Sequence, residues 1–291
     1  YVDIQTLIDI TRMNLPKFKE IIIIYHADCI DGYGAAWSAF MHYGNQARYV
    51  PARFGEPFPK HNENCEIYIL DFSYSPDIIL DVAKTVKHLT LIDHHVTAMK
   101  QFENVPMPKN VTVHFDMNHS GCVLAWQHFF PDHEVPIILN HIEDRDLWRF
   151  QLAGTQEITT AIYEKMPLSF KAFGSLNLKN LFSLGRIQVA QMAKMVKRLT
   201  RYAHPITINN TTGLAVNAGP CFSSDLGHLL AEKSNGVGMV YYYDGGKRRW
   251  TYSLRSIGDL VDVSALAVQY GGGGHFNAAG FSLSHNPFLP T

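Results

Sequence analysis

The sequence IIIIYHADCIDG at residues 21–32 joins a short apolar run to a loop rich in acidic and histidine side chains. The apolar run at residues 21–25 is far shorter than the roughly 20 residues that cross a membrane, so it predicts a buried strand. The loop after it supplies His26, Asp28 and Asp31. In open parallel sheets, ligands bind beyond the carboxyl ends of the strands, so this loop is a candidate site.

The same pattern repeats along the first half of the chain. Apolar runs typical of strands alternate with helical periodicity, which predicts an α/β fold with a parallel sheet and helices on both faces. Strands are expected at residues 66–72, 88–93 and 111–116, and helices around residues 35–40, at 76–86 and from about 120 onward. A helical connector is expected at residues 135–202, and it includes a long periodic run at 178–199.

A second, smaller α/β domain is expected at residues 205–291, after a first domain at residues 1–200. Its predicted strands are residues 213–219, 237–243 and 249–256, and its predicted helices are residues 223–233 and 261–270. A short amphipathic helix is also expected at residues 4–13.

The composition limits the class of partner. Hydrophobic residues make up 46% and charged residues 18% of the 291 residues, and the formal net charge is −1. Proteins that bind long nucleic acids neutralise many phosphates with a basic surface, which this chain lacks. We therefore expect a short nucleotide or oligonucleotide as partner and no long duplex. No segment is apolar enough for a membrane span, and the first residues do not resemble a signal peptide.

The cysteines give no sign of a structural role. Cys29, Cys65, Cys122 and Cys221 are far apart in the chain and form no CxxC pair. This spacing argues against a disulfide framework and a structural zinc site, and it favours reduced thiols in a cytoplasmic protein. The sequence leaves open whether the protein forms a homodimer.

Acidic and histidine side chains gather where the predicted strands end. The loops supply, in chain order, His26, Asp28, Asp31, Asp71, Asp93, His94 and His95, and a further acidic segment lies at residues 143–146. Gathering so many carboxylates is unfavourable unless a cation neutralises them. Carboxylates with a few imidazoles suit Mn²⁺ or Mg²⁺, and this number of carboxylates favours two ions.

Simpler explanations exist for two of the features. An aspartate after a strand is often a helix N-cap, and this alternative stays open for Asp71. The run at residues 178–201 carries a basic face formed by Lys194, Lys197, Arg198 and Arg201. That face either binds phosphates or is simply solvated.

The order of these motifs resembles the DHH phosphoesterase superfamily. The resemblance rests on Asp93-His94-His95 after a strand, on HADCIDG and LDF upstream, and on DRDLWRF downstream. The segments SLRS (residues 253–256), VDVSALA (261–267) and GGGGHFNAAG (271–280) resemble the DHHA1 domain of the oligoribonuclease and pAp-phosphatase members. The resemblance implies a DHH domain with a parallel sheet, followed by the helical connector and the smaller DHHA1 domain.

The resemblance also implies residue roles. His94 is expected to bind metal and Asp71 to bridge two metals. His95 is expected near the substrate phosphate, with Asp93 orienting the pair, so these two are the candidate catalytic residues.

The first and fourth motifs leave choices open. Asp144 matches the acid of the fourth motif, although Asp146 competes for that role. The first motif departs from the usual spacing of the family: His26 and Asp31 are expected ligands, and the place of Asp28 among the ligands is open.

The glycine run of the second domain is a candidate phosphate site. Gly272, Gly273 and Gly274 let backbone N–H groups approach a phosphate closely, and the apolar residues on either side predict a buried turn. His275 follows the run, and the guanidinium of Arg255 suits phosphate oxygens. We expect all five residues to bind substrate.

These features predict a two-metal phosphodiesterase that hydrolyses short oligonucleotides or linear dinucleotides to mononucleotides, as an oligoribonuclease or exonuclease does. Alternatives within the superfamily are a pAp 3′-phosphatase and a cyclic-dinucleotide phosphodiesterase. A third alternative is a nucleotide sensor without catalytic activity, although such a protein would be expected to lose acidic ligands that this chain keeps.

Overall fold

The fold is described from a computed structural model that places residues 20–288. The helix expected at residues 4–13 lies outside this range. The chain divides into two compact units between Val189 and Ala190.

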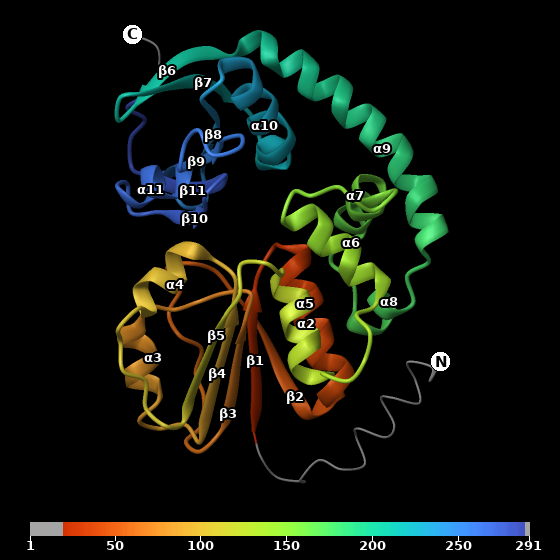
Figure 1. The fold of residues 1–291 in the computed structure, drawn as a ribbon, viewed down its shortest axis with the longest axis vertical. Helices are drawn as coiled ribbons and strands as arrows, with labels where there is room; N and C mark the ends of the chain where they lie inside the picture. The colour runs from red at the N-terminus through yellow and green to blue at the C-terminus, as the bar shows by residue number, and fades with distance from the viewer. Residues whose placement is uncertain (1–19, 289–291) are drawn as a thin grey trace. The chain divides into compact units, whose positions relative to one another are not determined.

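A parallel sheet forms the centre of the first unit (Figure 1). Its strands run in the spatial order β2-β1-β3-β4-β5, and every neighbouring pair is parallel. The strands are β1 (Ile21–His26), β2 (Ala47–Ala52), β3 (Glu66–Leu70), β4 (His88–Asp93) and β5 (Val111–Phe115). The predicted α/β fold with a parallel sheet is confirmed.

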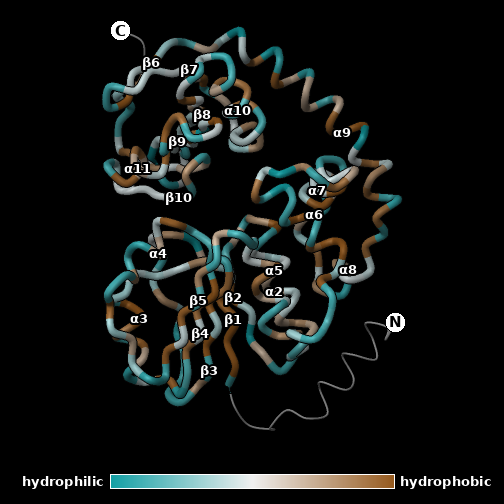
Figure 2. The backbone as a smooth tube through the Cα atoms, viewed as in Figure 1, coloured by the Kyte–Doolittle hydropathy of each residue, from teal (hydrophilic) through white to brown (hydrophobic). Residues whose placement is uncertain are grey.

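Helices cover both faces of this sheet. Successive side chains of β1 point to opposite faces, and each face carries its own core. Ile21 and Ile23 belong to the core under helices α2 (Ile30–Tyr43) and α5 (Gly121–Phe129). Ile22 and Ile24 belong to the opposite core, under α3 (Pro76–Val82) and α4 (Val96–Phe102). Figure 2 shows much of β1 as hydrophobic, as expected for a strand whose first four residues are buried.

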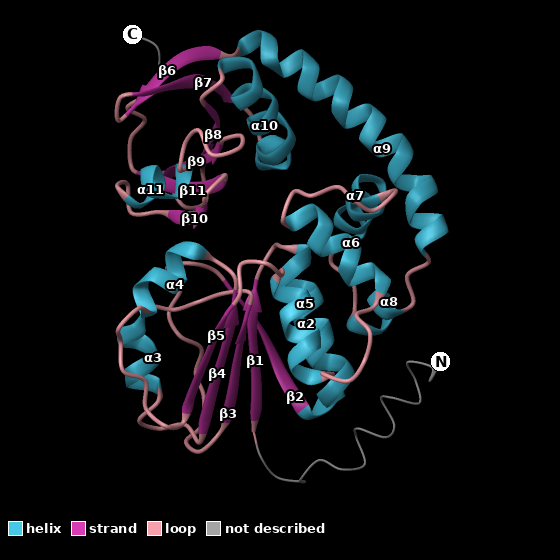
Figure 3. Ribbon diagram, in the orientation of Figure 1, coloured by secondary structure: helices cyan, strands magenta, loops and turns pink. Residues whose placement is uncertain are grey.

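A helical segment follows the sheet, as predicted. It consists of α6 (Ile137–Asp146), α7 (Thr155–Lys165), α8 (Phe170–Gly174) and the long α9 (Leu178–Leu199) (Figure 3). Helix α6 packs against α2, α5 and α7, so its C-terminal end is held close to the first sheet. The boundary between the two units falls inside α9.

The second unit has a mixed sheet with the order β10-β11-β9-β8-β7-β6. Only β7 and β8 are parallel to each other, and the other neighbours are antiparallel. One core contains Leu226 and Leu230 of α10, and another contains Val263 and Leu266 of α11. The elements of this unit are β6 (His204–Ile208), β7 (Thr211–Asn217), α10 (Ser223–Ser234), β8 (Val237–Asp244), β9 (Arg249–Arg255), α11 (Val263–Val268), β10 (Gly273–His275) and β11 (Ala278–Leu283), with 3-10 turns at Thr200–Tyr202 and Pro220–Phe222. A further 3-10 turn, Gly44–Gln46, lies in the first unit.

Several elements differ from the sequence prediction. Strands β2, β6, β10 and β11 and helix α4 were not predicted. The helix expected at residues 76–86 ends at Val82. The buried turn expected at the glycine run is wrong: Gly273 and Gly274 begin β10 and are only half-buried. Glycine carries no side chain that could signal a strand, so periodicity cannot detect such an element.

Of the helices within residues 20–288, none combines the length and the apolarity of a membrane-crossing span.

Candidate metal centre

Three neighbouring strands deliver their last residues to one edge of the first sheet. Strand β1 ends at His26, β3 is followed directly by Asp71, and β4 ends at Asp93, followed by His94 and His95. Since β1 pairs with β3 and β3 with β4, all in parallel register, these ends lie next to each other. The sheet topology therefore brings together side chains that are far apart in the sequence.

Asp71 lies at the middle of this edge and is held in an uncommon backbone conformation. Its φ is 55°, in the left-handed region, and its N–H donates to the carbonyl of Ile92 at 2.9 Å. A Cβ on Gly121 would lie 2.3 Å from Asp71 Cβ, so only glycine fits there. Residues other than glycine rarely adopt the left-handed backbone region, and those that do are often found at functional sites.

The two carboxylate oxygens of Asp71 face different histidines. Oδ1 lies 3.1 Å from His94 Nε2, and Oδ2 lies 3.5 Å from His26 Nδ1. The residue is only 1% exposed. Within residues 20–288, Oδ2 is buried and makes no hydrogen bond. A buried carboxylate oxygen without a donor is costly, and a cation between the two residues would satisfy it.

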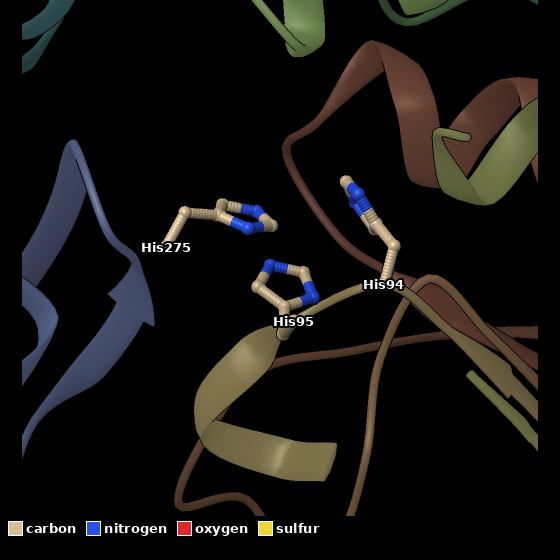
Figure 4. A group of neighbouring side chains, drawn as sticks. All are labelled: His94, His95 and His275. Atoms are coloured by element: carbon tan, nitrogen blue, oxygen red, sulfur yellow. The ribbon is translucent and has the colours of Figure 1, made fainter. Parts of the chain in front are cut away.

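His94 directs one ring nitrogen at three carboxylates. His94 Nε2 lies 3.1 Å from Asp71 Oδ1, 3.5 Å from Asp31 Oδ2 and 3.6 Å from Asp146 Oδ2. Figure 4 shows the side chains of His94 and His95, which lie between the end of β4 and the start of α4. A nitrogen and several carboxylate oxygens around one point form a typical site for a divalent cation.

Asp31 is anchored by the start of another helix. It lies in the first turn of α2, is fully buried, and accepts N–H bonds from Gly121 at 2.7 Å and Cys122 at 3.0 Å. These two amides belong to the first turn of α5, where backbone N–H groups have no helical partner and stabilise an anion. The helices thus fix the position of Asp31 beside His94.

Asp93 organises the two histidines that follow it. It accepts the backbone N–H of His94 at 2.7 Å, and its Oδ1 lies 2.6 Å from His95 Nδ1. Ser73 donates to its other oxygen at 2.5 Å. Burial alone would lower the pKa of His95, but Asp93 outweighs burial and raises it. Asp93 therefore orients both rings and favours the protonated form of His95.

The acidic residues of the cluster disfavour one another's charge. Burial, together with Asp71 and Asp146, raises the pKa of Asp31 well above its usual range. Burial would raise the pKa of Asp71 as well, but His26 and His94 outweigh burial and lower it. Burial would lower the pKa of His94, but Asp71, Asp146 and Asp31 raise it to about 10. A divalent cation placed among these groups would relieve the repulsion between the carboxylates.

The structure brings one unpredicted side chain to the cluster and keeps a predicted one away. The side chain of Asp28 is 72% exposed and pairs with Arg53 at 2.7 Å. In its place, a ligand atom of Cys29 lies within 4.8 Å of one from His26 and one from Asp71. Sequence reasoning set the cysteines aside because it looked for pairs. The position of Cys29, three residues after His26, was the available signal.

No model of a known protein family matches the chain. It is 30% identical over 289 residues to an uncharacterized protein of Acanthamoeba polyphaga mimivirus, and the match covers 90% of this chain and 67% of that protein. It is also 38% identical over 63 residues to oligoribonuclease NrnB of Bacillus subtilis, a match that covers 22% of this chain and 15% of NrnB.

Two solved structures share the fold. An exopolyphosphatase-related protein from Bacteroides fragilis matches 97% of this chain and 92% of its own, with a TM-score of 0.55 and 14% identity. RecJ from Thermus thermophilus, solved in complex with Mn²⁺, matches 96% of this chain and 52% of its own, with a TM-score of 0.53 and 12% identity. Asp93-His94-His95 lies at a strand end of this shared fold. The chain has the fold of these two proteins, and its motifs resemble those of the DHH phosphoesterases.

The acidic segment at the end of α6 holds two aspartates with different surroundings. Asp144 accepts N–H bonds from Gln151 at 2.8 Å and Leu152 at 2.9 Å, and the hydroxyl of Thr155 at 2.5 Å. Both of its oxygens are therefore used to hold the loop after α6. The motif match had favoured Asp144 as the residue beside His94. In the structure Asp146 lies there instead.

The predicted substrate residues lie in the second unit, where two of them share a row. His275 on β10 and Arg255 on β9 both pair with Ala278 of β11, so the three residues lie side by side on one face. The guanidinium of Arg255 donates to Ser224 Oγ at 2.9 Å, and a Cβ on Gly227 would lie 2.9 Å from Arg255 Cγ. A Cβ on Gly272 would lie 2.0 Å from the carbonyl of Gly280, and Gly274 has a φ of 141°.

Proposed function

We propose that this protein is a metal-dependent phosphodiesterase that hydrolyses short oligonucleotides or linear dinucleotides to mononucleotides. One observation carries the proposal: Asp71 lies between His26 and His94 at the carboxyl edge of the parallel sheet, with one oxygen toward each. The carboxylates of Asp31 and Asp146 also lie close to His94 Nε2. Such an arrangement suits two neighbouring divalent ions.

Asp71 would be the residue that both ions share. His26 would hold the first ion together with one oxygen of Asp71, and Asp31, His94 and Asp146 would hold the second together with the other oxygen. When bound, a pair of ions supplies Lewis acidity and a nucleophile at neutral pH for phosphoryl displacement. The Mn²⁺ complex of RecJ, which has the same fold, supports Mn²⁺ as the ion.

His95 would serve the substrate and not the metal. Asp93 lies against Nδ1 and raises the pKa of the ring, which favours the protonated form, and in that form Nε2 can donate to a phosphoryl oxygen. A protonated imidazole stabilises the charge that develops there as the bond to phosphorus breaks. Asp93 would act through His94 and His95 by fixing their orientation.

The second unit would bind the part of the nucleotide that does not react. Arg255 and His275 lie on one face of its sheet beside the glycines of β10, so two nitrogen-bearing side chains lie next to backbone that a phosphate could approach closely. The near-neutral net charge of −1 supports a short substrate over a long duplex. The local similarity to oligoribonuclease NrnB supports the same substrate class.

A substrate panel tests the proposal. Purified protein with Mn²⁺ is offered pGpG, a longer RNA, pAp and a cyclic dinucleotide, and products are separated by chromatography. We expect the highest kcat/KM for the linear dinucleotide, with mononucleotides as the only products. Preference for pAp or for the cyclic compound would replace the proposed substrate by that one. Binding of a nucleotide without turnover of any would identify a sensor and sink the enzymatic proposal.

A further inference from the structure

Cys29 lies at the junction of β1 and α2, at the N-cap position of the helix. Serine, aspartate and asparagine at this position commonly cap a helix, but the side chain of Cys29 makes no capping hydrogen bond. Its thiol is free of disulfide bonds and half-buried. Cross-linking therefore does not explain a cysteine here.

The sulfur of Cys29 belongs to the acid and histidine cluster. One ligand atom each from His26, Cys29 and Asp71 lies within 4.8 Å of the others. Asp28, the carboxylate next to it in the sequence, is directed into solvent and paired with Arg53. Among the described residues of this loop, the sulfur therefore stands where a third ligand to the ion of His26 would be needed.

A second observation points to a ligand at the same place. Asp71 Oδ2 is buried and makes no hydrogen bond within residues 20–288, and the residue as a whole is 1% exposed. This oxygen faces His26 Nδ1 at 3.5 Å, while the other oxygen faces His94. The oxygen that lacks a donor is thus the one on the side of His26. A positive ion at this side would satisfy it.

We propose that Cys29 binds the ion of His26 and Asp71 as a thiolate, so that this half of the centre selects Co²⁺, Zn²⁺ or Fe²⁺ over Mg²⁺. The inference deepens the proposed function and rests on it, because it assumes the metal centre. A thiolate is a soft ligand that favours such ions, whereas Mg²⁺ requires oxygen ligands. On binding, the S–H bond breaks, the proton passes to solvent, and the sulfur lone pair forms the bond to the ion.

The two halves of the centre would then differ in their preferred ion. The side of Asp31, His94 and Asp146 offers carboxylate oxygens and one imidazole, a set that suits Mn²⁺ or Mg²⁺. The side of Cys29 offers one sulfur, one imidazole and one carboxylate. When Mg²⁺ is the only ion supplied, we therefore expect it to occupy the side of Asp31, His94 and Asp146 and to leave the side of Cys29 empty.

Cobalt titration tests the sulfur directly, because a thiolate bound to Co²⁺ gives a charge-transfer band in the near ultraviolet. Co²⁺ is added to metal-free full-length protein without substrate, and the band and the number of bound ions are recorded. Wild-type protein should develop the band. Cys29→Ser should lose it and bind this ion at least about ten-fold more weakly, since even outer partners of ligands cost that much. The matched control is Cys221→Ser, which changes an exposed cysteine of the second unit and should keep the band.

Two further experiments test the inference without relying on the Cys29→Ser variant alone. Cys29→Asp should bind an ion without the band and should let Mg²⁺ compete. In wild-type protein, saturating Co²⁺ should slow alkylation of Cys29 but not of Cys221, as followed by mass spectrometry. An unchanged band in Cys29→Ser, or equal alkylation of Cys29 with and without Co²⁺, would overturn the inference.

These measurements separate the inference from the proposed function. If the band fails while Mn²⁺ still supports dinucleotide hydrolysis, the thiolate ligand is wrong and the enzyme stands. If the band appears and no nucleotide is hydrolysed, the metal site stands and the proposed function fails.

Discussion

Asp71 is the residue on which the centre depends most. Its carboxylate contacts both His26 and His94, and its backbone is held in the left-handed region. The sequence predicted its place, because it follows a strong apolar strand, and offered a helix N-cap as the alternative. It could not predict the left-handed backbone, which depends on the space that Gly121 leaves.

Asp71→Asn should abolish turnover while keeping the fold. Asparagine has the same size and tolerates a positive φ, but it lacks the charge that two ions require. We expect kcat to fall at least about a hundred-fold and ion binding to weaken on both sides of the residue. Calorimetric titration with Mn²⁺ and steady-state kinetics give both values.

In excess EDTA the same variant should be less stable than wild type. His26 and His94 outweigh burial and lower the pKa of Asp71, so its charge is net favourable in the folded protein despite repulsion with Asp31 and Asp146. Differential scanning calorimetry would show the decrease in Tm. Wild-type kcat in this variant would mean that Asp71 only terminates its strand.

Gly121→Ala tests the space around Asp71 without touching a charged group. The added Cβ would lie 2.3 Å from Asp71 Cβ, so Asp71 or the start of α5 must move. We expect a loss of about 1–3 kcal/mol in the free energy of unfolding, which is typical of overpacking, together with weaker Mn²⁺ binding.

Gly219→Ala is the control for the glycine variant. Its φ is −64° and nothing lies within 4 Å of the added Cβ, so denaturation and Mn²⁺ binding should match wild type. Normal stability and normal Mn²⁺ binding in Gly121→Ala would show that the edge of the sheet is less tightly packed around Asp71 than these distances indicate.

At the scale of elements, helix α6 shows why a motif match does not tell which of two nearby aspartates lies beside His94. Asp144 and Asp146 are two residues apart, so they lie on different faces of the helix and only one can reach His94. The sequence named both candidates. The choice depends on how α6 packs against α2 and α5, which no local pattern reveals.

The two aspartates of α6 should respond differently to substitution. Asp144→Asn removes the charge from a group that accepts three hydrogen bonds, so we expect a loss of about 1–3 kcal/mol of stability. Asp146→Asn should keep the Tm and lose Mn²⁺ affinity and turnover. Thermal unfolding and isothermal titration of both proteins would check this, and the reverse pattern would return the ligand role to Asp144.

Prediction from sequence succeeded for elements with a strong pattern. Strand β4 and the long helix α9 have the expected bounds, because their apolar residues repeat with a clear period. Strand β2 was missed, because ARYVPA alternates poorly and contains proline at the edge of the sheet. Cys29 was missed because the conformation of its loop, with Asp28 at a φ of 59°, decides which side chain faces the cluster.

At the scale of the whole molecule, the chain separates the candidate metal residues from the candidate substrate residues. The former lie in the unit that ends at Val189, and Arg255 and His275 lie in the unit that follows. This order along the chain was predicted from the sequence by resemblance. The row of His275, Ala278 and Arg255 was not predicted, because strands β10 and β11 are too short or too rich in glycine to be recognised.

Arg255→Ala and His275→Ala should weaken substrate binding and spare metal binding. Each loses a charge-assisted contact of roughly 1.5–3 kcal/mol, so kcat/KM for a dinucleotide should fall on the order of ten- to a hundred-fold. A small artificial phosphodiester without the second nucleotide should be affected much less. An equal loss on both substrates, or loss of bound Mn²⁺, would show that these residues serve the chemistry or the fold instead.

The central claim is that the cluster around Asp71 is a metal centre that hydrolyses a phosphodiester bond. The most direct test is the rate of pGpG hydrolysis by protein of known metal content, with Mn²⁺ added back and in excess EDTA. We expect mononucleotide to form with Mn²⁺, its formation to stop with EDTA, and activity to return when Mn²⁺ is restored. Full turnover by protein whose metal content is measured as nil would contradict the claim.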